Sequence, residues 1–203
     1  MSTERAMAEL DEHEESDRRD QILDAANLCF SQLGIQRTSV QDVARMAGVS
    51  RGTVYRYFED RTILIEAAID YGAQKFYREV AAAMAKKSTL AEQVGAMAET
   101  HAKILLDHRT RNRLMADDSE LMRHMIADGD SAVRRTTAFL VPYVREAQKR
   151  GEVGTDVDVT AASEWLARII YSFSTVNEAQ TFDMSKPATV RRYVQRFAIN
   201  GLR

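Results

Sequence analysis

An all-α fold is predicted by the scarcity of turn-forming residues and by the helical spacing of apolar residues along most of the chain. The 203 residues include only 9 glycines and 2 prolines, whereas an all-β protein needs a turn signal every 8–12 residues or so. Hydrophobic residues make up 45% and charged residues 29% of the chain, a balance typical of a domain with its own core. The length fits one full-sized domain, or a small module joined to a larger one.

Charge, cysteine content and hydropathy exclude several functional classes. The net charge of −2 gives no global indication of a nucleic-acid or membrane partner. The single cysteine, Cys29, cannot form an internal disulfide, which excludes a secreted disulfide scaffold. No apolar run reaches the roughly 18 residues of a membrane span, and the acidic first 20 residues lack the apolar segment of a signal peptide. We therefore expect a cytoplasmic protein without a membrane partner.

The chain divides into three parts by composition and periodicity. Residues 1–16 carry six carboxylates against Arg5 alone, which predicts a disordered acidic tail. Residues 17–60 show the pattern of three short, closely spaced helices. Residues 61–203 show longer helical patterns and are expected to form a larger helical domain.

Helix boundaries in the first 60 residues follow from capping and turn residues. A helix is expected from about Asp17, with Gly34 just beyond its end. Thr38 or Ser39 can cap a second helix. Gly48 permits a sharp turn, and Ser50 can cap a third helix that runs from Arg51 to Phe58.

Breaks between apolar-periodic segments place the later helices. A long helix is expected from Arg61 to about Lys87. The further expected helices span about 89–107, 110–127, 130–150, 158–178 and 186–200.

A helix, a glycine turn and a second helix within about twenty residues form the helix-turn-helix arrangement. The first helix braces the second, whose outer face can then enter the major groove of DNA. Between Arg37 and Arg61 there are five arginines and three carboxylates, so positive charge gathers locally. Spacing alone leaves two interpretations open, a DNA-reading face or an ordinary three-helix cluster with exposed polar groups. The expected outer face consists of Arg51, Gly52, Thr53, Tyr55, Arg56 and Tyr57.

The run TSVQDVARMAGVSRGTVYRYFEDRTILIEAA, residues 38–68, resembles the DNA-binding signature of the TetR (tetracycline-repressor-like) transcriptional regulators. The resemblance extends to the preceding helix and covers about 50 residues; outside the motif it is weak. It implies an all-helical homodimer in which residues 17–60 bind DNA and residues 61–203 bind a small-molecule ligand and dimerise.

Site residues follow from the resemblance position by position. It implies base contacts from Gln41, Arg51, Gly52 and Thr53. It implies phosphate contacts from Tyr55, Tyr57, Arg61 and the helix N-terminus at Thr38 or Ser39, with Arg56 on the same face. Two departures concern the phosphate contacts: Arg61 stands where the family usually has lysine, and Glu59 and Asp60 bring negative charge close by.

The late helices are expected to form the dimer interface, although some of their apolar residues must serve the chain's own core. The candidates are Ala162, Leu166, Ile169, Ile170, Phe173, Val190, Tyr193, Val194 and Phe197. The middle of the chain is expected to hold an effector pocket, although methionine-rich stripes also fit plain core. The pocket candidates are His101, Leu105, His108, Met115, Met122, Met125, Phe139, Trp165, Arg168 and Tyr171.

The predicted function is a repressor that an apolar or amphipathic ligand releases from a palindromic operator. An enzyme is the main alternative, but the sequence has no Glu-x-x-His pair, Cys-x-x-Cys, HExxH, Walker or dinucleotide-glycine motif. Neither a catalytic residue nor a cofactor is therefore predicted. The region from His108 to His124 could hold a metal, but it fits a charged loop better. A helical scaffold that binds another protein is the third class.

Overall fold

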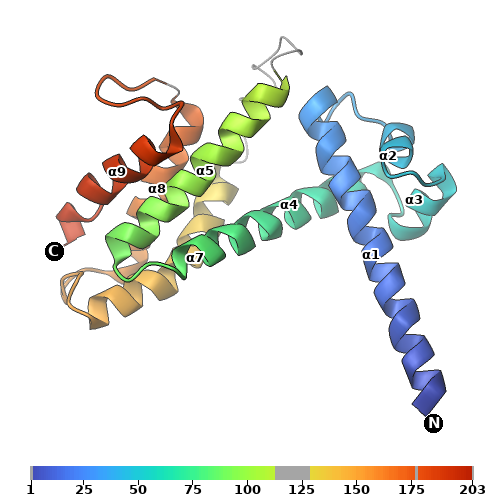
Figure 1. Ribbon diagram of the computed structural model, residues 1–203, viewed down its shortest axis with the longest axis horizontal. Coiled ribbons are helices and arrows are strands. Elements are labelled where there is room, and N and C mark those ends of the chain that lie inside the picture. Colours follow the sequence, from blue (N-terminus) through green and yellow to red (C-terminus); the bar gives the residue numbers. More distant parts are fainter. Residues whose placement is uncertain (1, 113–128, 177, 203) are drawn as a thin grey trace. The chain divides into compact units, whose positions relative to one another are not determined.

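The computed structural model describes residues 2–112, 129–176 and 178–202, and within these ranges it contains helices and no strand (Figure 1). The predicted all-α class is confirmed. The chain forms two compact units, Met1–Lys75 and Phe76–Arg203. None of the described helices combines the length and apolarity needed to cross a membrane.

The N-terminal unit consists of α1 (Ser2–Leu33), α2 (Val40–Met46), α3 (Arg51–Tyr57) and the first part of α4 (Arg61–Met84). One apolar face of α1 packs against the other three helices. The cluster is formed by Ile22, Leu23, Ala25, Ala26, Cys29, Val40, Val43, Ala44, Ala47, Val54, Phe58, Leu64 and Ala68. Cys29 is thus a buried core residue, and burial raises the pKa of its thiol.

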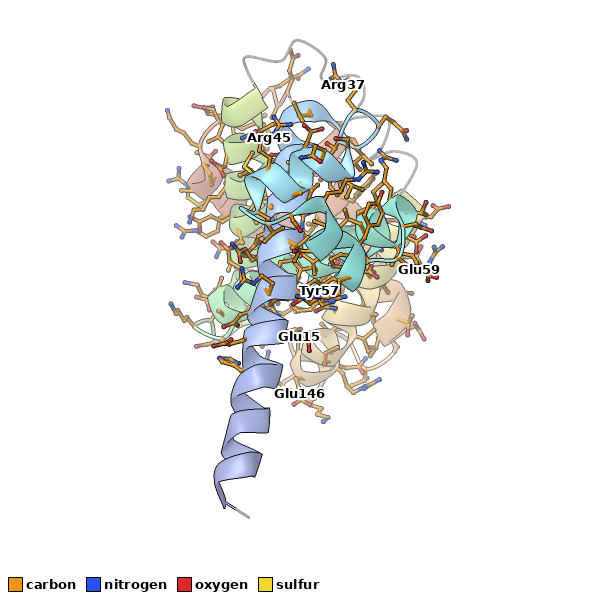
Figure 2. The ribbon with its side chains drawn as sticks, turned by 90° about the vertical axis from the view of Figure 1, so that its right-hand side faces the viewer. Glu15, Arg37, Arg45, Tyr57, Glu59 and Glu146 are labelled. Atoms are coloured by element: carbon orange, nitrogen blue, oxygen red, sulfur yellow. The ribbon has the colours of Figure 1, made fainter. Side chains whose placement is uncertain are left out.

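Helix α1 is much longer than the sequence predicts. It begins at Ser2, so the structure has helix where a disordered tail was expected over residues 1–16. Glutamate, alanine and methionine in this stretch favour helix, and carboxylates near a helix N-terminus are stabilised by the helix dipole. The part of α1 around Glu15 extends beyond α2 and α3 (Figures 1 and 2).

Helix α4 contributes to both units. Leu64 and Ala68 belong to the N-terminal core, whereas Val80 and Met84 belong to the second core. The two compact units divide after Lys75, whereas the predicted boundary at residue 60 marks the beginning of α4. The sequence pattern marks where the helix begins, but the two cores that share it decide the division.

The second unit contains the rest of α4, α5 (Leu90–Asn112), α7 (Gly129–Lys149), α8 (Val159–Thr175), α9 (Pro187–Phe197) and the 3-10 turn Asn200–Leu202. Helix α7 packs on α8 and α5 packs on α9 (Figure 1). A Cβ at Gly95 would overlap Cγ of Gln195, so glycine permits the close approach of α5 and α9. Most of the helix expected over 110–127 lies outside the described residues.

His101 on α5 is a polar group inside the second unit. Its Nε2 lies 3.0 Å from the hydroxyl of the buried Ser174 on α8, and its ring meets the edge of Phe76 with 5.8 Å between ring centroids. Its Nδ1 is buried without a hydrogen-bond partner among the described residues. Burial lowers the pKa of His101 from 6.5 to about 4, so the imidazole is neutral at neutral pH.

We expect this neutral imidazole to make unfolding easier as the pH falls from 6.5 towards 4. In that window the unfolded chain binds a proton that the folded protein does not, so the free energy of unfolding decreases by up to about 1.4 kcal/mol per pH unit. His101→Gln should flatten this slope in urea unfolding between pH 5 and 7. Ser174→Ala keeps the imidazole and should keep the slope. Equal slopes in the parent and His101→Gln would contradict the assignment.

Candidate nucleic-acid interface

Helices α2 and α3 are joined by a tight turn around Gly48. Gly48 has φ +66°, a left-handed conformation that glycine adopts without steric cost. The amide of Val49 donates to the carbonyl of Ala44 at 2.9 Å, and the half-buried Val49 packs against the core. The predicted helix-turn-helix is therefore confirmed, and the turn before α3 is fixed by its backbone hydrogen bond to α2 and by the packing of Val49.

The N-terminus of α2 is closed by a capping box between Ser39 and Asp42. The Asp42 amide donates to the Ser39 hydroxyl at 3.2 Å, and the Ser39 amide donates to the Asp42 carboxylate at 3.0 Å. Hydrogen bonds from the hydroxyl and amide of Ser39 lower the pKa of Asp42, and Arg45 lowers it further. Thr38, the other expected cap, is buried and its hydroxyl donates to the carbonyl of Gly34 at 2.8 Å. Ser39 is therefore the cap, and Thr38 holds the preceding loop.

The start of α3 is capped by Ser50. Its hydroxyl accepts the Thr53 amide at 2.9 Å and lies 2.8 Å from the Thr53 hydroxyl. Thr53 is consequently half-buried and held close to the cap. Gly52 is exposed, and its missing side chain leaves the helix backbone open to a close partner.

The outer face of α3 carries two arginine–tyrosine pairs. The Arg51 guanidinium lies 5.3 Å from the centroid of the Tyr55 ring and donates to its hydroxyl at 3.3 Å. Arg56 lies 5.1 Å from the centroid of the Tyr57 ring and also donates to its hydroxyl at 3.3 Å. Neither arginine is ion-paired with a carboxylate of the described residues, so both charges face outward.

The opposite side of α3 is apolar and anchored. Val54 is 1% exposed, and Phe58, which follows the last helical residue, is 2% exposed. Tyr57 is half-buried against this core, whereas Arg51, Tyr55 and Arg56 stay exposed. Gln41 is exposed on α2. The structure thus confirms that Val54 and Phe58 face inward and that Arg51, Tyr55 and Arg56 face outward, whereas Tyr57, predicted on the outer face, packs partly against the core. Arg45 and Tyr57 mark α2 and the end of α3 in Figure 2.

The beginning of α4 differs from the expectation of a direct phosphate contact. The Arg61 side chain is half-buried and donates to backbone carbonyls of the loop between α1 and α2. The carboxylate of Asp60 accepts the amide of Ile63 at 2.9 Å and so caps α4. Its charge therefore serves the start of the helix, while Glu59 is exposed (Figure 2).

A glycine turn, two capped short helices and an outward face of arginine, tyrosine and backbone define a DNA-binding helix-turn-helix protein. The family described as "Bacterial regulatory proteins, tetR family" matches residues 22–68. Residues 22–68, which contain the helix-turn-helix, are therefore a DNA-binding segment of the kind found in the TetR family of transcriptional regulators.

Two relatives from Pseudomonas putida illustrate the match. The probable regulator ArpR is 28% identical over 159 residues, 74% of this chain and 75% of ArpR. The regulator TtgR is 26% identical with the same coverage. Both are transcriptional regulators, a class of protein distinct from enzymes.

The fold is shared with solved structures. FadR from Bacillus subtilis, in complex with stearoyl-CoA, aligns with a TM-score of 0.65 and 20% identity over 90% of this chain and 98% of FadR. A TetR/AcrR-family regulator from Thermobifida fusca aligns with a TM-score of 0.57 and 23% identity over 92% of this chain and 99% of that one.

The expected ligand residues are not all brought together. His101 and Phe139 belong to the interior of the second unit, and Leu105 is half-buried on α5. Trp165 is 53% exposed, and the exposed Arg168 pairs with Glu164 at 2.6 Å. These two lie on the outside of α8, so we revise their assignment.

The remaining ligand candidates give less information. Tyr171 is half-buried beside Gly129, where a Cβ would lie 2.8 Å from its hydroxyl. Met115, Met122 and Met125 lie outside the described residues, and His108 is placed only as part of α5. The region suggested as a metal site falls there too, and no cluster of possible metal ligands occurs among the described residues.

The expected dimer residues separate into two sets. Ala162, Leu166, Ile170, Val190 and Val194 are at most 3% exposed and belong to the core of the unit, so we revise their assignment to intrachain packing. Ile169 and Phe173 are half-buried, whereas Tyr193 is 37% and Phe197 53% exposed. The helical spacing predicts both sets equally, because buried and exposed apolar residues share one face of α9 and one wide apolar face of α8.

The second set lines a groove of about 580 Å³ on α8, α9 and the connection between them. It consists of Ile169, Phe173, Tyr193 and Phe197. Phe182, from that connection, stacks on Tyr193 with 4.5 Å between ring centroids. Val176 at the end of α8 is 59% exposed. The sequence prediction omitted both residues. Val176 continues the apolar spacing of Phe173 within the expected helix, and Phe182 is an isolated phenylalanine in a polar connection; these were the available signals.

The capping box on α2 provides a test of the local geometry. Ser39→Ala removes the hydroxyl that accepts the Asp42 amide and donates to its carboxylate, so we expect a loss of about 1 kcal/mol in the free energy of unfolding. The pKa of Asp42 should rise towards its ordinary value, which NMR titration can follow. Gln41→Ala, at an exposed neighbouring position outside the box, is the control. An unchanged Asp42 titration in Ser39→Ala would contradict the box.

Proposed function

We propose that the protein is a homodimeric repressor that binds a palindromic operator and is released from it by a small apolar or amphipathic ligand. The observation that carries the proposal is the outer face of α3, where Arg51, Tyr55 and Arg56 stand exposed around a bare backbone at Gly52. A major groove about 12 Å wide admits one helix. The cytoplasm, where such a regulator meets its operator, is the proposed location.

Base reading would come from the first turn of α3. Arg51 can form a bidentate contact with guanine, which is worth about 1–3 kcal/mol of discrimination. To reach a base, the Arg51 side chain must either leave the Tyr55 ring or move together with it. Gly52 permits close approach, Thr53 can meet a thymine methyl, and Gln41 extends the contacts from α2.

Phosphate contacts would position this face on the duplex. Tyr55 and Tyr57 offer hydroxyl groups, and the capped N-terminus of α2 at Ser39 offers backbone amides. Arg56, which no carboxylate of the described residues neutralises, adds charge to the same side. Such contacts make the affinity depend on salt.

Two copies are needed because the α3 helix, with 7 residues, reads few bases. Two-fold symmetry would place the half-sites about one helical turn apart or slightly more. We assign the dimer contact to the exposed part of α8 and α9, with Trp165, Tyr193 and Phe197 at its centre. Apolar side chains of this size are typical anchors of protein interfaces.

The ligand would bind in the second unit, whose interior contains partly buried aromatic rings from α4 and α7. Tyr77 and Phe139 lie 4.9 Å apart, and Phe139 and Tyr143 lie 5.3 Å apart, between centroids. The Tyr77 hydroxyl lies 2.9 Å from that of Thr136, and His101 adds a neutral polar group. Apolar walls with a few uncharged polar groups suit an apolar or amphipathic molecule, and FadR of Bacillus subtilis provides a related case with stearoyl-CoA.

The proposed division of labour keeps residues 17–60 for DNA and residues 61–203 for ligand and dimer. Helix α4 joins the two activities because both cores include part of it. A ligand that favours a spacing of the two α3 helices unsuited to adjacent major grooves would release the DNA. A coupling of about 1–3 kcal/mol would change operator affinity 5–150-fold.

Selection of bound sequences from random duplex DNA tests the DNA-binding proposal. We expect enrichment of a palindrome, and we expect the double substitution Arg51→Ala and Tyr55→Phe to abolish the preference while the fold and the dimer persist. Arg134→Ala, which removes an exposed arginine of α7, is the control and should select the same sequence. No enrichment by the parent would favour the scaffold alternative, and a double variant that binds the selected duplex like the parent would place the base contacts outside Arg51 and Tyr55.

The dimer assignment has its own test. Trp165→Ala combined with Phe197→Ala should weaken dimerisation by about 30-fold or more, because truncation of interface anchors costs about 2 kcal/mol or more. Sedimentation velocity measures the effect. Thr160→Ala, exposed on α8 outside the groove, is the control. If the double variant remains dimeric at concentrations where the parent is half dissociated, the interface lies elsewhere.

A further inference from the structure

Arg61, the first residue of α4, holds the loop between α1 and α2. Its Nε donates to the carbonyl of Thr38 at 3.1 Å. Its Nη2 donates to the carbonyls of Ile35 and Gln36 at 2.5 and 3.2 Å. One side chain thus gathers three backbone carbonyls that lie 23 to 26 residues earlier in the chain.

The loop itself is also shaped by local hydrogen bonds. Thr38 turns inward and bonds to the carbonyl of Gly34 through its amide and hydroxyl, at 3.2 and 2.8 Å. Arg37 donates to the carbonyl of Leu33 at 2.8 Å. These bonds join near neighbours in the chain, so they shape the loop without tying it to α4. Arg61 supplies that tie.

The residue that follows the held carbonyls is the N-cap of α2. Ser39 begins the capping box with Asp42, and the direction of α2 depends on where this box sits. Arg61 therefore acts on the first turn of α2, which carries Gln41 and the amides expected to face a phosphate. The Arg61 guanidinium would thus influence DNA binding through the backbone of the 34–39 loop, without touching the DNA.

The chemistry of the contact requires arginine. A guanidinium presents five donors in a rigid plane, whereas a lysine ammonium is a compact charge on a flexible stem and cannot reproduce the fork. No carboxylate of the described residues is ion-paired with Arg61, and Asp60 uses its carboxylate to cap α4. The hydrogen bonds of Arg61, and not an ion pair, define its position.

We propose that Arg61 is a positioning residue for DNA binding, which sets the N-terminus of α2 by its hydrogen bonds to the 34–39 loop and does not act through a direct phosphate contact. The inference rests on the proposed DNA-binding function. It assigns to Arg61 a role different from the phosphate contact that the sequence predicts.

Charge and geometry can be separated by two substitutions. Arg61→Lys keeps the positive charge but loses the planar set of guanidinium donors, whereas Arg61→Gln loses both the charge and these donors. A positioning role predicts that both variants weaken binding to the duplex selected by the parent, by about tenfold or more, since a lost contact of about 1.4 kcal/mol corresponds to tenfold. It also predicts that the dependence of affinity on salt is unchanged, because each lost phosphate contact would reduce the slope of log K against log salt by about 0.9.

Asn27→Ala is the matched control for stability. Asn27 of α1 donates to the carbonyl of Ala68 on α4 at 2.8 Å, so this variant also removes a side-chain bond between α4 and the rest of the unit without touching the 34–39 loop. It should lower stability and leave DNA affinity within about twofold of the parent. Affinities are compared at a temperature where circular dichroism shows every variant fully folded.

Hydrogen exchange in the free protein gives a readout without DNA. In Arg61→Lys the amides of Thr38 and Asp42 should exchange faster than in the parent, because the loop and the cap lose their restraint. In Asn27→Ala these amides should exchange at the parental rate.

Three results would overturn the proposal. Parental affinity in Arg61→Lys, with a shallower salt slope in Arg61→Gln, would make Arg61 a phosphate contact. Parental affinity in both variants would make it a brace for stability alone. If the parent selects no duplex, the DNA-binding proposal fails by itself. The exchange data then decide on Arg61, and unchanged exchange in Arg61→Lys would overturn its hold on the loop.

Discussion

The DNA-reading surface depends on the packing of one apolar face of α1 against α4 and against two short helices, α2 and α3, that could not persist alone. Helices α2 and α3 have 7 residues each, well below the roughly 12–15 residues at which isolated helices become even marginal in water. Their stability comes from burying Val43, Val54 and Phe58 against Ile22 and the residues near it. Because the aliphatic side chain of Val54 and the Phe58 ring lie on the inner side, Arg51, Tyr55 and Arg56 on the outer side take no part in the core.

Capping and loop restraints then convert this packing into a defined geometry. Ser39 and Ser50 close the two helix starts, Gly48 makes the turn between them, and Arg61 ties the preceding loop to α4. Each restraint satisfies backbone groups that the helices cannot satisfy themselves. Arg51 and Arg56, which take no part in these restraints, lie over tyrosine rings and remain available to an anionic partner.

The second unit follows the same physics with different consequences. Helices α7 and α8 and helices α5 and α9 bury enough apolar surface for a core, and the excess apolar surface of α8 and α9 remains outside. Inside, His101 stays neutral because its environment cannot solvate a charge. An exposed apolar face and an interior that accepts uncharged polar groups are the two properties that a dimeric, ligand-responsive regulator requires of this unit.

The sequence by itself determined the helical class, the helix-turn-helix and most of the inward and outward residues of α3, because glycine, capping serines and 3.6-residue periodicity act locally. It did not determine that residues 2–16 are helical, since charge density and helix propensity pointed in opposite directions there. Tertiary structure alone decided which apolar residues of α8 and α9 are buried, because the same apolar face of each helix carries both buried and exposed residues and periodicity cannot tell a core from an interface. It alone decided that Thr38 turns inward and that Arg61 bonds to carbonyls 23 to 26 residues away, since such partners are set by the meeting of distant segments and leave no local pattern.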